Sequence, residues 1–318
     1  MFAVSPRPDR VSLLNARTRT PVGPALRGRL GYVTALAFSP DGKLIAATGT
    51  RQAVIWNTAQ RKIIRVLPVG FPVGNGNHRA GAVSFSPDGM TVAIGRSDSI
   101  VALYDLRTGG QTHKLVSYGS ILDLDFSSDG KLLATAELGS AFIWNVAGES
   151  IVSDLKDRPP SLSVRFSPSD DKLVAVGIFS GRVVFRKLDP THGFQGAWAA
   201  PRAGRSLTGH NGGVVSLDFS PNGRTLVTLS DDGKLRLWDV ATRKLIGAPL
   251  PVSNTGGSVH FFPDGKHVLG VFGSGAGIVW SVDPADWAAK ACNIAHRNLT
   301  RAEWAEFLGH RRYANTCP

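Results

Sequence analysis

The most constraining feature of this 318-residue sequence is a five-residue motif that recurs six times. It joins an aromatic residue to a turn resembling Ser-Pro-Asp-Gly, and its copies begin at Phe38, Phe85, Phe126, Phe166, Phe219 and Phe261. The intervals between the copies are 47, 41, 40, 53 and 42 residues. Self-similarity at a period near 40 residues indicates a repeat architecture, in which each unit packs on its neighbours.

The unit from Leu207 to Val240 shows what one repeat contains. Val215, Leu217 and Phe219 alternate with polar residues, which is the period-2 signal of a strand. A Pro-Asn-Gly turn follows, and then two further apolar runs are separated by an Asp-Asp-Gly turn. Each unit therefore predicts at least three antiparallel strands joined by tight turns.

This unit resembles the WD-repeat family, in which four-stranded antiparallel blades surround a central channel. In such a blade a histidine, a strand hydroxyl, a turn aspartate and a tryptophan indole form a buried hydrogen-bonded chain. The resemblance assigns these roles to His210, Thr228, Asp232 and Trp238. A fully paired buried network satisfies its polar groups and fixes the geometry of the blade. We therefore interpret the four residues as structural, and not as a catalytic histidine–aspartate pair.

The number of blades depends on how the two ends of the repeat region are interpreted. Residues 2–5, 11–15 and 21–26 are expected to be the second, third and fourth strands of a unit that has no first strand. The last unit supplies three strands up to about Val282. We expect an all-β propeller over residues 1–282, with seven blades and an incomplete first blade. A six-blade ring closed by a terminal strand is the alternative, and a longer parent protein is expected in both cases.

The first strands of the six units with the motif should begin near Tyr32, Ala80, Gly119, Ser161, Gly212 and Thr255. The missing first strand would leave an unpaired edge at the channel.

Residues 283–318 change from a strand pattern to a helical one. Asp283-Pro284 predicts a helix start, and Trp287 recurs at helical spacing with later apolar residues. We expect a short helical tail that docks on the last blade. This tail resembles those of WD-repeat regions in bacterial STAND-type ATPases or Ser/Thr kinases. Docking could bring Cys292 and Cys317 together to form a disulfide. The preferred alternative is that both thiols stay reduced, because cytoplasmic disulfides are uncommon.

The chain is basic, with a formal net charge of +12. The sequence contains no block of five like charges and no basic helix with interleaved aromatic residues. An acidic protein partner therefore suits this surface better than nucleic acid. No apolar run reaches the roughly 18 residues that a membrane span needs, and the first residues lack the pattern of a secretory signal. We expect a cytoplasmic protein that has no membrane contact.

The sequence contains no motif for catalysis or cofactor binding. A phosphate loop of the G-x-x-x-x-G-K-[ST] type and the kinase motifs are missing, and the eight histidines show no metal-ligand spacing. We expect no catalytic residue, no metal and no cofactor. The alternatives are a propeller hydrolase or lyase with its site at the channel mouth, and a nucleic-acid-binding propeller.

The expected function is a non-catalytic protein-interaction scaffold or sensor, within a bacterial signalling protein. Two insertions carry candidate anchors, residues 68–80 and residues 189–204, and Trp198 lies in the second. The partner is expected on the face where the channel opens, because exposed aromatic and arginine side chains are favoured interface anchors. The residues that supply them are Tyr32, Arg51, Phe71, His78, Arg79, Arg96 and Phe179.

Overall fold

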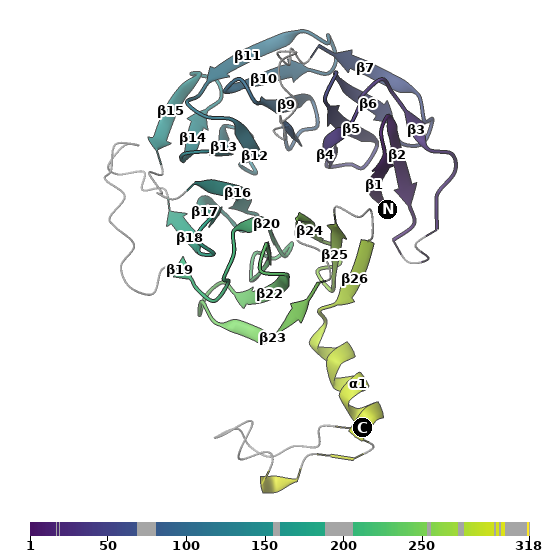
Figure 1. The fold of residues 1–318 in the computed structure, drawn as a ribbon, viewed down its shortest axis with the longest axis vertical. Coiled ribbons are helices and arrows are strands. Elements are labelled where there is room, and N and C mark those ends of the chain that lie inside the picture. The colour runs from purple at the N-terminus through teal and green to yellow at the C-terminus, as the bar shows by residue number, and fades with distance from the viewer. Residues whose placement is uncertain are drawn as a thin grey trace.

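The strands form seven antiparallel sheets arranged as blades around a central channel (Figure 1). The computed structural model describes residues 1–16, 18, 20–68, 81–154, 160–187, 206–252, 256–272, 277–295, 297–298, 300–302 and 317. The seven-blade propeller is confirmed, and the six-blade alternative is wrong.

The blades are numbered here in chain order. Blade 1 contains β1 (Phe2–Arg7), β2 (Arg10–Leu14) and β3 (Leu26–Arg27). Blade 2 contains β4 (Val33–Phe38), β5 (Leu44–Gly49), β6 (Ala53–Asn57) and β7 (Ile63–Leu67). Blade 3 contains β8 (Gly81–Phe85), β9 (Thr91–Arg96), β10 (Ile100–Asp105) and β11 (Gln111–Val116). Blade 4 contains β12 (Ile121–Phe126), β13 (Leu132–Glu137), β14 (Ala141–Asn145) and β15 (Ser150–Asp154).

The remaining three blades follow the same plan. Blade 5 contains β16 (Ser161–Ser167), β17 (Asp170–Ile178), β18 (Val183–Lys187) and β19 (Ser206–Leu207). Blade 6 contains β20 (Val214–Phe219), β21 (Thr225–Ser230), β22 (Lys234–Asp239) and β23 (Leu245–Pro251). Blade 7 contains β24 (Gly257–Phe261), β25 (His267–Phe272) and β26 (Gly277–Ser281). The first strands of blades 2 to 7 begin within two residues of the positions expected from the repeat.

Blades 1 and 7 each have three strands among the described residues, whereas the other five have four. In blade 2, Ile45 of the second strand lies opposite Trp56 of the third. In blade 1, Phe2 lies opposite Leu14 in the same relation, so β1 and β2 are a second and a third strand. Among the described residues, the strand missing from blade 1 is therefore the innermost one, and the strand missing from blade 7 is the outermost one.

The recurring motif is a turn that its own side chains hold together. In blade 2, the Ser39 hydroxyl donates a hydrogen bond to Asp41 Oδ1 over 2.7 Å, and it accepts one from the Leu44 amide over 2.9 Å. Gly42 has a φ of 68°, which few other residues adopt without strain. The motif thus recurs because each first strand must reverse tightly into the second.

The apolar core lies between neighbouring blades. One cluster joins Val11 and Leu13 of blade 1 to Ile45 and Trp56 of blade 2, and equivalent clusters lie between the later blades. The tryptophan near the end of the third strand is almost fully buried in blades 2 and 4, as Trp56 and Trp144. Burial of this apolar surface between blades is what stabilises the ring.

Helix α1 (Pro284–Ala295) follows β26 and leads away from the ring (Figure 1). Asp283 Oδ1 accepts a hydrogen bond from the Ala285 amide over 3.0 Å and so caps the helix start. Trp287 packs against the apolar cluster of the last blade, and its indole N–H donates to the Ser281 carbonyl over 2.7 Å. In the described part of the chain, no helix combines the length and hydropathy that crossing a membrane requires.

Candidate interaction surface and channel

Two sets of turns meet at one end of blades 2, 4, 5 and 6. The turn before the first strand and the turn between the second and third strands share an end because neighbouring strands are antiparallel. Backbone hydrogen bonds tie these turns together, from Thr50 to the Tyr32 carbonyl over 3.0 Å and from Leu138 to the Ser120 carbonyl over 3.3 Å. We call this end of the ring the channel-opening face.

The structure places some of the expected anchors on this face in exposed positions. Tyr32 is 72% exposed and Phe179 is 60% exposed, and Arg51 is also exposed. The Arg96 side chain is only 18% exposed, and its Nε donates to Asp98 Oδ1 over 2.9 Å. Phe71, His78 and Arg79 lie outside the described residues, as does the second insertion with Trp198.

Two further anchors on the same face were not foreseen from the sequence. Tyr118 is 81% exposed in the turn before the first strand of blade 4. Leu138 is 59% exposed in the turn between the second and third strands of that blade. The available signal was their position, because they occupy the same turns as Tyr32 and Phe179 in blades 2 and 5. The four side chains are exposed on turns of this face in blades 2, 4 and 5.

The four residues assigned to a buried chain come together in blade 6. The Trp238 indole N–H donates to Thr228 Oγ1 over 2.9 Å, and Thr228 Oγ1 lies 2.8 Å from His210 Nε2. His210 Nδ1 lies 3.1 Å from both carboxylate oxygens of Asp232. Because the indole can only donate, Thr228 Oγ1 accepts from Trp238, and the His210 ring lies between this hydroxyl and the Asp232 carboxylate.

Arg236 also belongs to this cluster, although the sequence did not suggest it. Its Nη1 donates to Asp232 Oδ2 over 2.8 Å and also contacts His210 Nδ1. Burial of the ring, together with the Arg236 guanidinium, lowers the pKa of His210 to about 4. The histidine is therefore neutral at pH 7.

Blade 4 builds a shorter chain with a different acid. The Trp144 indole N–H donates to Thr135 Oγ1 over 3.1 Å, and Thr135 donates to Glu137 Oε1 over 3.0 Å. Ser117 also donates to Glu137 Oε1, and the Gly119 amide donates to Oε2 over 3.1 Å. Burial raises the pKa of Glu137 above its ordinary value. A single strand glutamate therefore takes the place of the histidine and aspartate used in blade 6.

The interior of the channel carries charged side chains from the first strands. Asp123 Oδ2 accepts from Arg165 Nη1 over 2.6 Å and from the Val164 amide over 3.0 Å. Asp125 Oδ2 accepts from the Phe166 amide over 2.8 Å. Each of these carboxylates thus joins blade 4 to blade 5 by a hydrogen bond that crosses between blades.

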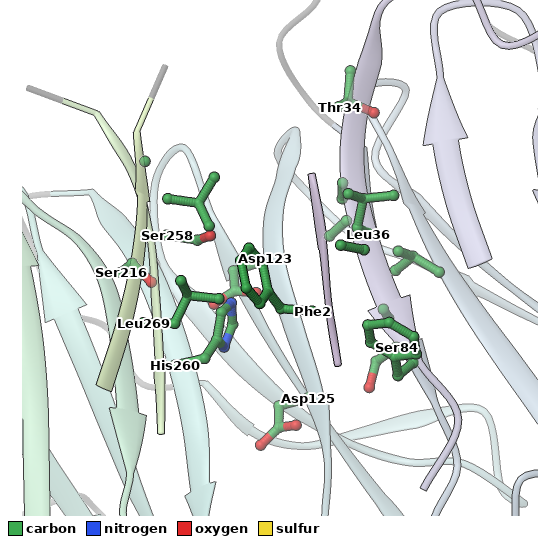
Figure 2. A pocket seen from close by; sticks show the side chains of 18 of the residues that line it. Phe2, Thr34, Leu36, Ser84, Asp123, Asp125, Ser216, Ser258, His260 and Leu269 are labelled. Atoms are coloured by element: carbon green, nitrogen blue, oxygen red, sulfur yellow. The ribbon is translucent and has the colours of Figure 1, made fainter. Parts of the chain in front are cut away.

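Blades 6 and 7 are joined in the same way, by a carboxylate of one blade that accepts from a backbone amide of the next. Asp218 Oδ2 accepts from the Phe261 amide over 2.8 Å and lies 3.8 Å from His260 Nδ1. Burial raises the pKa of Asp218 to about 6, and it raises the pKa of Asp125 to about 7. Figure 2 shows Asp123, Asp125 and His260 around the cavity that these strands enclose. Within the described ranges, no group of three or more His, Cys, Asp or Glu side chains is arranged to hold a metal ion.

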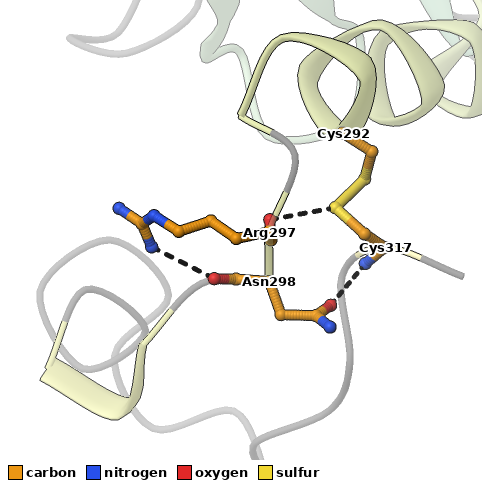
Figure 3. Close-up of a disulfide and its surroundings, with 4 residues drawn as sticks. All are labelled: Cys292, Arg297, Asn298 and Cys317. Carbon is orange, nitrogen blue, oxygen red and sulfur yellow. Dashed lines mark hydrogen bonds between the residues drawn. A yellow bond between two sulfur atoms is a disulfide. The ribbon is translucent and has the colours of Figure 1, made fainter.

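The two cysteines lie in the C-terminal segment and form a disulfide (Figure 3). The Cα atoms of Cys292 and Cys317 are 5.4 Å apart, within the range that a bridge requires. Asn298 Oδ1 accepts from the Cys317 amide over 2.6 Å, which holds the returning chain beside the helix end. The preferred expectation of two reduced thiols is therefore wrong for this structure.

Comparison with known proteins addresses the family directly. The family model described as "WD domain, G-beta repeat" matches residues 23–57, 109–145 and 202–239. Three segments of the chain thus match WD40 repeats, and the fold that holds them is a seven-blade propeller. Each matched segment ends with the Trp-Asn or Trp-Asp pair that closes the third strand of a blade. The tryptophans of these pairs are Trp56, Trp144 and Trp238.

Curated relatives are also WD40-type proteins. The chain is 26% identical over 259 residues to a guanine nucleotide-binding protein subunit beta of Arabidopsis thaliana, covering 73% of this chain and 64% of that protein. It is 25% identical over 239 residues to the corresponding subunit of Nicotiana tabacum, covering 68% and 58%. It is 30% identical over 132 residues to small ribosomal subunit protein RACK1y of Oryza sativa subsp. japonica, covering 41% and 38%. The chain thus spans less than two thirds of the length of these relatives.

Proposed function

We propose that this chain is a non-catalytic protein-interaction platform that recruits a protein partner through its channel-opening face. The observation that carries the proposal is the arc of exposed Tyr32, Tyr118, Leu138 and Phe179 on the turns of that face. Large exposed apolar side chains gathered on one surface mark interaction sites, and aromatic residues are common anchors. The relatives support the proposal because their names describe subunits of larger assemblies.

The charge of the surface favours an acidic partner. The chain carries a net charge of +12, and Arg51 lies exposed beside Tyr32 on the channel-opening face. A positive surface raises the association rate of an acidic protein and orients it as it docks. Arg79, Phe71 and His78 remain part of the proposed face by their place in the sequence.

The cellular setting is also proposed. The C-terminal segment resembles those of bacterial signalling proteins, which supports a signalling role in a bacterial cytoplasm. The Cys292–Cys317 bridge provides a test of this setting, because cytoplasmic thiol systems keep most cysteines reduced. If the protein is cytoplasmic, these systems reduce the Cys292–Cys317 bridge in the cell, and protein unfolded directly from cells under alkylating conditions should yield two free thiols. Two cysteines that both escape alkylation because they form a disulfide would contradict the cytoplasmic assignment.

Affinity capture with matched variants tests the proposed face. The bait is the full chain, exposed to a lysate of cells that naturally express it, and bound proteins are quantified by mass spectrometry. The face variant carries Tyr118→Glu and Phe179→Glu. The control variant carries Met90→Glu and Leu245→Glu, which are also exposed but lie beside turns at the opposite end of the blades.

A genuine partner should be captured by the wild type and the control, and its yield should fall by about tenfold or more with the face variant. If the face variant and the control capture the same proteins in equal amounts, the proposed face is not the binding surface.

A further inference from the structure

Blade 1 ends at the channel in a strand that has a free edge. In blades 2 to 6 the second strand pairs with a first strand on its inner side, whereas β1 pairs only with β2. The described residues supply no backbone partner for the inner edge of β1. Unpaired strand edges are ready templates for pairing with another extended segment.

On one side of the space beside β1, the side chains of β4 are more exposed than the equivalent side chains of the other blades. Leu36 stands two residues before the motif aromatic of β4 and is only partly buried, as is Phe38 itself. The residues two positions before the aromatic in the other five units are at most 9% exposed; they are Val83, Leu124, Val164, Leu217 and Val259. Leu36 faces blade 1, so the cover that it lacks is an innermost strand of that blade.

The opposite wall shows the same deficit. Val271 of β25 faces blade 1 and is only partly buried. The residues at the same register in blades 2, 4 and 6 are Thr48, Ala136 and Leu229, and each is fully buried. The loss of burial is therefore local to the two surfaces that border the missing strand.

A cavity of about 610 Å³ joins this space to the channel. Residues from the inner strands of all seven blades line it, including β1, β4 and the first two strands of blade 7. Figure 2 shows Phe2 lying between Leu269 on one side and Leu36 on the other, with the β1 strand beside them. The space thus has two apolar walls and a hydrogen-bonding edge, which are the three surfaces that an added strand needs.

We propose that this space binds an extended peptide segment that has the pattern of the chain's own first strands and completes blade 1 by pairing antiparallel to β1. The pattern is an apolar residue, one intervening residue and a phenylalanine, followed by a Ser-Pro-Asp/Asn-Gly turn, as in 214–223. Phe38 lies opposite Ile45 in blade 2, and Phe2 occupies the position of Ile45 in blade 1. The phenylalanine of the added segment therefore lies opposite Phe2.

The proposal does not depend on the channel-opening face, because the contacts lie inside the ring. The test uses a fluorescently labelled synthetic peptide with the sequence of residues 214–223, VVSLDFSPNG, titrated with the full chain and followed by anisotropy. A second peptide carries proline at the position of Leu217, which removes an amide hydrogen and disrupts strand pairing. The first peptide should bind saturably, and the proline peptide should bind about tenfold or more weakly.

Two protein variants locate the binding. Val271→Glu places a charge in the wall of the space, whereas Val215→Glu places the same charge on a partly buried channel residue between blades 6 and 7, away from blade 1. Val271→Glu should weaken binding by about tenfold or more, and Val215→Glu should change it by no more than about twofold.

Absence of binding by the wild type overturns the proposal. Equal binding of both peptides overturns it too, since pairing would not be involved, and so does equal weakening by the two variants. If Val271→Glu fails to fold, as judged by circular dichroism, the comparison of the two peptides on the wild type decides.

Discussion

Replacing Thr228 with valine tests the buried chain of blade 6 with a change of almost constant shape. Thr228 is fully buried, and its hydroxyl accepts from the Trp238 indole and lies 2.8 Å from His210 Nε2. Valine keeps the volume but leaves two buried polar groups without a partner. Each such group costs about 1–3 kcal/mol, so the expected loss of unfolding free energy is about 2–6 kcal/mol.

Thermal unfolding followed by circular dichroism measures this loss. A change of 2 kcal/mol corresponds to a fall in Tm of roughly 3 °C for a chain of this length. Thr225→Val is the matched control, because Thr225 lies on the same strand and bonds to Ser220 through its backbone only. The control should stay close to the wild type. Equal falls in Tm for the two variants would show that the hydroxyl network contributes nothing specific.

Three further predictions concern other parts of the molecule. Asp232→Ala should lower Tm more than Asp231→Ala, because Asp232 accepts from buried partners and Asp231 is exposed; equal Tm values would contradict this. Burial raises the pKa of Asp125 to about 7, so its contribution to stability is complete below pH 4 and is lost as pH rises towards 7. The free energy of unfolding of Asp125→Asn should therefore rise by about 1–2 kcal/mol relative to that of the wild type between pH 5 and pH 8. Urea unfolding of both proteins at the two pH values measures this change, and an equal difference at both values would contradict the effect of burial. Deleting residues 283–318 should uncover the apolar cluster that Trp287 covers and cause aggregation, whereas a monomer with unchanged Tm in light scattering and thermal unfolding would mark the segment as dispensable.

The ring itself could be predicted from the sequence because its determinants are local. The turn at Ser39 to Leu44 is held by contacts within six residues, and similar turn sequences recur in the units from blade 2 to blade 7. The position of Phe2 opposite Leu14 likewise follows from strand patterns that are close in sequence. Such short-range chemistry is visible without a structure.

The chemistry of the site was harder to foresee because it depends on contacts between distant residues. Glu137 was missed because it reaches Thr135 and Ser117 from within a strand, whereas the family pattern places the acid in a turn. The tie between Asp123 and Arg165 spans two blades and exists only once the ring has closed. The Cys292–Cys317 bridge similarly depends on how the chain returns past Asn298.

The central claim is that a protein partner binds the channel-opening face, and hydrogen–deuterium exchange of the complex tests it most directly. The captured partner is added to the full chain, and amide exchange is compared with that of the free protein. The account predicts slower exchange in the turns that carry the exposed anchors, at residues 30–34, 50–52, 117–120, 138–140 and 179–182. Protection confined to the outer strands β7, β11, β15 and β23, or to α1, would contradict it.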